Sequence, residues 1–130
     1  MANVPKDLMY SKEHEWVQRM GNGQVRVGIT DFAQRQLGDI VFVELPKVGD
    51  RFDVGRAFGS VESVKAVSEL YMPVAGTIVA VNVDMNDDPE MINQDPYDGW
   101  MIEITLAKAS DTDNLLSAAQ YEAYLSEEAD

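Results

Sequence analysis

The residue of this sequence with the clearest chemical potential is Lys65, the only basic residue between Arg56 and Lys108. Its neighbours Val64 and Ala66 are small and apolar, and the segments on both sides have the composition of strands. We therefore expect Lys65 at the tip of a hairpin, projecting into solvent. The turn lacks the Asn-Gly pair of a two-residue loop, so a longer loop is implied.

Nucleophilic catalysis by this lysine is disfavoured. A lysine that forms Schiff bases needs a pKa depressed by burial or by a cationic neighbour. Glu62 and Glu69 lie near Lys65 in the sequence instead, and carboxylates favour the charged amine. Exposed lysines are also common on strands and turns, and composition alone does not separate Lys65 from such surface residues.

The composition excludes several other kinds of site. There is no cysteine, which excludes a disulfide framework, a thiol nucleophile and zinc–thiolate coordination. His14 is the only histidine, so a multi-histidine metal site and a Cys/His couple are excluded as well. With these constellations missing, an enzyme is the least favoured class of protein.

The net charge is −13 and is unevenly distributed. Residues 1–83 hold 10 acids and 9 bases, whereas residues 84–130 hold 13 acids and the single base Lys108. Nucleic acids and anionic membranes are therefore disfavoured as partners, because phosphate binding needs clusters of Lys and Arg. The acidic region is interpreted either as a solubilising surface or as a surface that steers the protein toward basic partners.

The length and the chain start favour one soluble domain. A chain of 130 residues has the size of one compact domain and can bury a hydrophobic core. No apolar run approaches the roughly 20 residues of a membrane span. The start, Met1 to Asp7, resembles neither a secretory signal nor an Arg-rich transit peptide. A soluble cytoplasmic protein is the plain interpretation.

Short strands dominate the first part of the chain. Residues 16–17 and 25–29 flank Gly21-Asn22-Gly23, which has turn chemistry and predicts a hairpin. Thr30 or Asp31 can cap a short helix over residues 32–37 that Gly38 ends. Residues 40–45 are β-branched and aromatic, which predicts a buried strand.

The second part adds strands and a terminal helix. Residues 77–83 and 100–106 are predicted strands, and Asp88-Pro89-Glu90 predicts one helical turn with proline at its first position. A C-terminal helix is predicted at about residues 113–125, where the apolar spacing is helical and buries one face, and residues 126–130 are expected to fray. The positions that define this face are Leu116, Ala119, Ala123 and Tyr124. Many short strands with frequent turns indicate a single mainly β domain, a small sandwich with short helical additions.

Five motifs occur in an order that resembles a known family. They are His14-Glu15-Trp16-Val17, residues 28–33, residues 37–46, the segment from Gly59 to Gly76 around Lys65, and Asp95-Pro96-Tyr97 with Gly99-Trp100-Met101-Ile102. From about Tyr10 to Leu125 the sequence resembles the H protein of the glycine cleavage system. One departure is that Asp98 alone separates Tyr97 from Gly99, where the family usually has one more residue.

The resemblance implies a fold and a carrier function. It implies a lipoyl-domain-like β-sandwich, or barrel-sandwich hybrid, with a lipoyl group attached to Lys65. It implies that the arm takes an aminomethyl group from the PLP-dependent glycine decarboxylase to the tetrahydrofolate-dependent aminomethyltransferase. Dihydrolipoamide dehydrogenase would reoxidise the arm, and a lipoate ligase or a lipoyl/octanoyl transferase would attach it. A monomeric carrier, itself not an enzyme, is expected.

The resemblance also implies a cleft in which the loaded arm folds back. Glu15 and Glu69, with Glu13 as a weaker candidate, would line it and face the ammonium of the aminomethyl group. The competing interpretation is that these residues are solvated surface acids. His14 is interpreted as a structural hydrogen-bonding residue, and Trp16 and Trp100 as core or cleft-wall residues.

Other functions stay open at this point. A biotin carrier is disfavoured, because biotin domains typically have methionine on both sides of the lysine, whereas this chain has Val64 and Ala66. A lipoyl domain of a 2-oxo acid dehydrogenase is shorter and lacks the flanking motifs. An acidic adaptor that is never modified, and a lipoyl relay that hands its acyl group to other complexes, also remain alternatives.

Overall fold

The fold consists of nine short strands, three α-helices and two 3₁₀ helices, described over residues 3–129 of a computed structural model. The strands are β1 Met9–Tyr10, β2 Glu15–Gly21, β3 Gln24–Ile29, β4 Ile40–Glu44, β5 Arg51–Phe52, β6 Ala57–Ser63, β7 Val67–Tyr71, β8 Gly76–Val81 and β9 Ile102–Leu106. The helices are α1 Asp31–Leu37, η1 Val83–Asn86, α2 Met91–Gln94, η2 Ala109–Asn114 and α3 Ala118–Ala129. Met1, Ala2 and Asp130, on which parts of the sequence predictions fall, lie outside the described residues.

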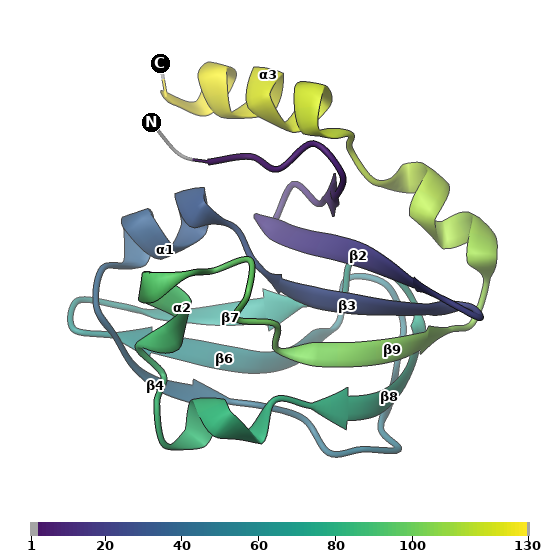
Figure 1. Cartoon of the computed structure of the whole chain (residues 1–130), viewed down its shortest axis with the longest axis horizontal. Helices are drawn as coiled ribbons and strands as arrows, with labels where there is room; N and C mark the ends of the chain where they lie inside the picture. The colour runs from purple at the N-terminus through teal and green to yellow at the C-terminus, as the bar shows by residue number, and fades with distance from the viewer. Residues whose placement is uncertain (1–2, 130) are drawn as a thin grey trace.

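The strands form two antiparallel sheets. One sheet has six strands in the order β1-β2-β3-β9-β8-β5, and the other has three in the order β4-β6-β7 (Figure 1). Fully buried side chains from both sheets share one core, with Val27 and Ile104 from the first sheet and Val61 and Leu70 from the second. The predicted mainly β sandwich is therefore confirmed. Among the described residues, no helix is long and apolar enough to cross a membrane.

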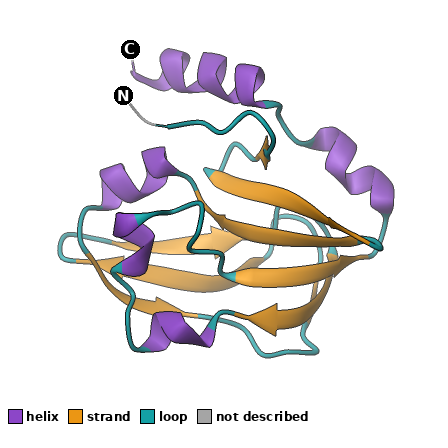
Figure 2. Cartoon of the chain, in the orientation of Figure 1, coloured by secondary structure: helices purple, strands orange, loops and turns teal. Residues whose placement is uncertain are grey.

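The helices lie outside the sheets (Figure 2). The N-cap of α1 is Thr30, whose side chain accepts the Ala33 N–H, and Gly38 ends the helix at φ 80°, as predicted. α3 covers a second, smaller cluster in which Tyr10, Trp16 and Tyr121 are completely or almost completely buried. The rings of Tyr10 and Tyr121 stack with centroids 4.6 Å apart.

The prediction for the C-terminal helix was wrong in its bounds and in its buried face. Residues 109–114 form η2, and α3 begins only at Ala118 and runs to Ala129, through the region expected to fray. Leu116 pairs with Tyr10 through two backbone hydrogen bonds of 2.8 and 2.7 Å, which keeps the chain extended there. The buried face of α3 is consequently formed by Ala118 and Tyr121, whereas Ala119 and Ala123 are exposed.

Two smaller predictions also need correction. The strand at Ile40 exists, but Val41 and Phe42 are each 51% exposed, because β4 is an edge strand with an irregular register between Ile40 and Phe42. The helical turn near Pro89 begins at Met91, so proline precedes the helix and does not occupy its first position.

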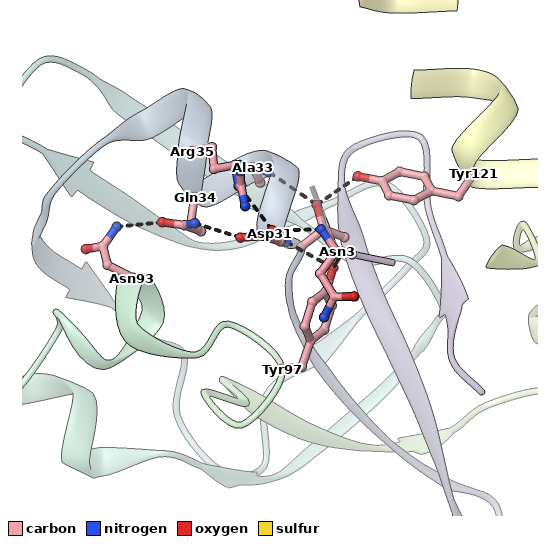
Figure 3. A network of polar contacts seen from close by, with 9 residues as sticks. Asn3, Asp31, Ala33, Gln34, Arg35, Asn93, Tyr97 and Tyr121 are labelled. Carbon is pink, nitrogen blue, oxygen red and sulfur yellow. Dashed lines mark hydrogen bonds and ion pairs between the residues drawn. The ribbon is translucent and has the colours of Figure 1, made fainter. Parts of the chain in front are cut away.

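A polar network joins the N-terminal segment to α1 and α2 (Figure 3). Asp31 accepts the Asn3 backbone N–H at 2.8 Å, the Gln34 amide at 2.7 Å and Arg35 Nε at 3.1 Å. Burial alone would raise the pKa of the Asp31 carboxyl, but these hydrogen bonds and the Arg35 charge lower it below its usual value. Gln34 in turn accepts a hydrogen bond from Asn93 of α2 at 2.9 Å.

Candidate functional site

Lys65 lies in the turn between β6 and β7 and is exposed. Three residues, Val64 to Ala66, separate the two strands, so both the hairpin tip and the loop longer than two residues are confirmed. The turn is closed by Ser63, whose backbone N–H donates to the Ala66 carbonyl at 2.8 Å. The Ser63 hydroxyl accepts the N–H groups of Lys65 and Ala66 at 3.3 and 3.1 Å. A side chain thus supplies the acceptor that orders the turn.

The outward face of the three-stranded sheet lies beside this turn. The register aligns Phe42 of β4, Glu62 of β6 and Val67 of β7 in one row, and all three side chains are exposed. Glu69 lies one row further along β7, opposite Ser60, and is also exposed. The surface next to Lys65 therefore combines apolar side chains with carboxylates.

Glu15, by contrast, is only 1% exposed. Its carboxyl group accepts the Tyr71 N–H at 2.8 Å and the Ser11 hydroxyl at 3.1 Å, and the first of these bonds joins β2 to β7. Burial raises the pKa of Glu15 to about 8, although these two hydrogen bonds act in the opposite direction. The interpretation as a solvated surface acid is therefore wrong for Glu15. Glu13 and Glu69, by contrast, are exposed.

A pocket of about 230 Å³ opens beside Glu15 at the end of β7 remote from Lys65. Its lining includes Glu13, Glu15 and Tyr71, with apolar atoms from Met72 and Leu115. The charge of Glu69 is the main cause that raises the pKa of the Tyr71 hydroxyl, and Glu13 and Glu15 contribute further. Of the three acids predicted from the sequence, Glu13 and Glu15 line the pocket, whereas Glu69 lies outside its lining, two residues before Tyr71 on β7.

Tyr71 and Ser11 also line this pocket, and neither residue was predicted from the sequence. Ser11 precedes Glu15 by four residues and bonds both its side chain and its backbone N–H. Ser11 is close to Glu15 in the sequence, but the pocket forms only when Tyr71 and the chain near Leu115 pack against this segment, and no local spacing signals those contacts.

The remaining predicted residues are structural in their contacts. His14 Nδ1 lies 2.9 Å from the Tyr121 hydroxyl, and the ring packs 4.7 Å from that of Phe32. Trp16 is buried and donates its indole N–H to the Pro96 carbonyl at 3.0 Å. Trp100 is half-buried, with the Arg26 guanidinium 4.8 Å from its ring centroid.

Comparisons with known proteins give a consistent result. Residues 8–128 match the family described as Glycine cleavage H-protein. The glycine cleavage system H protein of Geobacillus thermodenitrificans is 60% identical over 126 residues, covering 96% of this chain and 98% of the relative. The glycine cleavage system H protein of Anoxybacillus flavithermus is 58% identical over 127 residues, covering 97% of this chain and 99% of the relative. The crystal structure of a glycine cleavage system H protein from Mycobacterium marinum superposes with a TM-score of 0.87 at 40% identity, covering 95% of this chain and 99% of the other.

The two facing sheets and the lysine at the hairpin tip define a lipoyl-domain-like β-sandwich protein. Because the family match and the high-identity relatives extend over almost the whole chain, the chain belongs to the glycine cleavage H-protein family.

Proposed function

We propose that this chain carries a lipoyl group on Lys65 and presents it in turn to the enzymes of the glycine cleavage system. As a member of the H-protein family, the chain is the carrier component of that system. The single observation that carries the assignment to Lys65 is its exposed position at the tip of the β6–β7 hairpin. An amine held there is accessible to an acylating enzyme.

The residues around Lys65 fit a covalently attached arm. The turn is ordered by Ser63, and its strands rest on the shared core through Val61 and Leu70. A rigid base with a free tip lets a tether raise the effective concentration of its end at a docked active site toward the mM range. When bound, the lipoyl group supplies the disulfide and dithiol chemistry that accepts and releases the aminomethyl group. This chain supplies no sulfhydryl group of its own.

The pocket at Tyr71 is proposed as the place where the loaded arm folds back. β7 extends about 13 Å from Val67, next to the lysine turn, to Tyr71 at the pocket. An arm attached to Lys65 would lie along this strand to reach the pocket. Glu69 and Glu13 offer carboxylates at the surface of this region, and Glu15 offers one inside it. A cation brought next to Glu15 favours loss of the carboxyl proton, because opposite charge stabilises the ionised form. A charge-assisted hydrogen bond to an ammonium can then form.

The partners proposed are the glycine decarboxylase, the aminomethyltransferase, the dihydrolipoamide dehydrogenase and the enzyme that attaches the lipoyl group. Family membership supports association with the glycine cleavage system as a whole. The acidic composition of residues 84–130 favours partners with basic docking surfaces. We further propose that the protein is a cytoplasmic monomer that carries out no catalysis by itself.

The test of the attachment site is intact mass spectrometry after incubation of the apo-protein with lipoate ligase, ATP and lipoate. The unsubstituted chain should gain one lipoyl adduct, Lys65→Arg should gain none, and Lys47→Arg, which changes another exposed lysine, should behave like the unsubstituted chain. An adduct on Lys65→Arg would remove Lys65 from the proposal. A biotinyl adduct after isolation from native cells would contradict the lipoyl assignment.

The carrier role has a separate test, which is glycine–bicarbonate exchange by the cognate decarboxylase. The lipoylated chain should support exchange at low carrier concentration, and Lys65→Ala should not. Exchange retained in Lys65→Ala under the same conditions would show that the modified lysine takes no part in the reaction.

A further inference from the structure

The hairpin that carries Lys65 is attached to a second part of the chain. The Val64 N–H donates to the Asp39 carbonyl at 3.0 Å, which joins the tip to the segment between α1 and β4. Gly38 in that segment lies next to the lysine side chain, since a Cβ placed on Gly38 would lie 3.5 Å from Lys65 Cε. The position of the tip therefore depends on what holds residues 38–40.

Asn93 of α2 holds this segment with both ends of its amide. Its Oδ1 accepts the Ile40 N–H at 2.8 Å, and its Nδ2 donates to the Gly38 carbonyl at 2.9 Å. A backbone N–H can only donate and a carbonyl can only accept, so these two partners fix the orientation of the amide. The two bonds bracket Asp39, the residue whose carbonyl receives the hairpin tip.

Asn93 is itself fixed by α1. Its Nδ2 also donates to Gln34 Oε1 at 2.9 Å, and the Gln34 amide nitrogen donates to Asp31 at 2.7 Å (Figure 3). α1, α2 and the turn between β6 and β7 lie at the same end of the molecule (Figure 1). Hydrogen bonds thus link the start of α1 through Asn93 of α2 to residues 38–40, and the Asp39 carbonyl of that segment bonds the lysine turn.

We propose that Asn93 is a positioning residue for the modification of Lys65. By fixing residues 38–40, Asn93 holds the hairpin tip in the orientation in which an acylating enzyme meets the amine. Asn93 acts through this backbone segment and takes no part in the chemistry. The inference deepens the proposed function and rests on it, because Lys65 is the acceptor there.

Two substitutions disturb the segment from different sides. Asn93→Asp keeps the size of the side chain and the acceptor for the Ile40 N–H. It replaces the donor Nδ2 with an oxygen, which then faces two other acceptors, the Gly38 carbonyl and Gln34 Oε1. Gly38→Ala strains the same segment, since Gly38 has φ 80°. Asn82→Asp is the matched control, because Asn82 is buried and donates to the Trp100 carbonyl at 2.8 Å just beyond the end of β8 and before the start of β9.

Two readouts are needed on the apo-protein. The first is hydrogen exchange of the Val64 amide, measured by NMR relative to amides of β3 and β9. The second is kcat and KM for lipoylation by lipoate ligase with ATP and lipoate. Asn93→Asp and Gly38→Ala should each speed Val64 exchange about tenfold and lower kcat/KM by about the same factor. Asn82→Asp should lower the Tm while leaving both readouts within about twofold of the unsubstituted chain.

Unchanged Val64 exchange and unchanged kcat/KM in Asn93→Asp would overturn the proposal. So would equal losses of kcat/KM in Asn93→Asp and Asn82→Asp, since the effect would then be one of general stability. If the ligase fails to modify even the unsubstituted chain, the proposed function fails, whereas the Val64 exchange still decides whether Asn93 holds the tip.

Discussion

At the residue scale, Glu15 is the side chain whose environment departs furthest from its sequence context. It lies within His14-Glu15-Trp16, where an acid is expected to be hydrated, yet it is 1% exposed and bonded to Ser11 and Tyr71. A buried carboxyl remains protonated to higher pH because the low-dielectric interior disfavours its charge. Its pKa of about 8 therefore couples the protonation of one residue to the stability of the fold.

Glu15→Gln should remove a pH dependence of stability. The folded-state pKa of about 8 lies above the ordinary value of 4.5, so the folded chain binds a proton between these pH values that the unfolded chain does not bind. The free energy of unfolding of the unsubstituted chain should therefore fall as the pH rises from about 4.5 to about 8, by an amount on the order of a few kcal/mol. Above about pH 8 it should no longer change with this group.

Urea unfolding at a series of pH values tests this expectation. Glutamine keeps an acceptor for the Tyr71 N–H, so the variant should fold and lose most of the slope in this interval. Glu69→Gln, at an exposed position, is the control that should keep the slope. An identical slope in the unsubstituted chain and Glu15→Gln would contradict a raised pKa.

At the element scale, α1 connects the two hydrophobic clusters. Thr30 is completely buried, caps the helix by accepting the Ala33 N–H at 3.2 Å, and lies 2.7 Å from the Tyr121 hydroxyl of α3. The other end of α1 leads through Gly38 to β4 and the lysine turn. One short helix thus relates the position of the C-terminal helix to that of the hairpin.

Thr30→Val should destabilise the fold by about 2 kcal/mol, because it removes the cap and leaves the partly buried Ala33 N–H without that acceptor. The measurement is urea unfolding followed by circular dichroism. Thr105→Val is the isosteric control on an exposed position of β9, and it should change the free energy of unfolding by less than about 0.5 kcal/mol. Equal effects of the two substitutions would show that Thr30 does not act as a cap.

At the scale of the whole molecule, the charge is the dominant feature. The described residues include ion pairs such as Arg26–Glu103 at 2.7 Å and Arg35–Asp31 at 3.1 Å, but the chain has 23 acids and only 10 bases. The excess of negative charge gives a net repulsion that is stronger in the compact state than in the unfolded chain. The same excess of negative charge favours association with basic surfaces.

Added salt should consequently stabilise the protein. Raising NaCl from about 0.01 M to about 0.5 M shortens the Debye length from about 30 Å to below about 10 Å, so repulsion between separated carboxylates is screened. The Tm at neutral pH should rise by a few degrees. A Tm that falls with NaCl would show that attractive pairs such as Arg26–Glu103 outweigh the repulsion.

The whole chain is further predicted to unfold as one domain. Trp16 belongs to the smaller cluster beneath α3, whereas most strands pack into the larger core. The fluorescence of the tryptophans and the far-ultraviolet circular dichroism should report the same midpoint in urea, as expected for a two-state transition. An earlier fluorescence transition would indicate that the α3 cluster melts separately.

The sequence by itself determined the local features of this protein. The Gly21-Asn22-Gly23 turn requires backbone angles that only such residues adopt readily, and Thr30 and Gly38 bound α1 by their own hydrogen bonds and conformation. The hairpin position of Lys65 also follows from local composition. These features depend on interactions between residues a few positions apart, which the order of residues specifies directly.

Only the tertiary structure decided the rest. Leu116 pairs with Tyr10, which is more than a hundred residues away in the sequence. Because of this pairing α3 begins only at Ala118, and its buried face contains Tyr121 in place of the predicted Ala119. Burial of Glu15 against Tyr71 and the hold of Asn93 on residues 38–40 likewise join segments that are distant in sequence. A long-range contact replaces water around a group with protein, and no local pattern in the sequence records which segment will supply that contact.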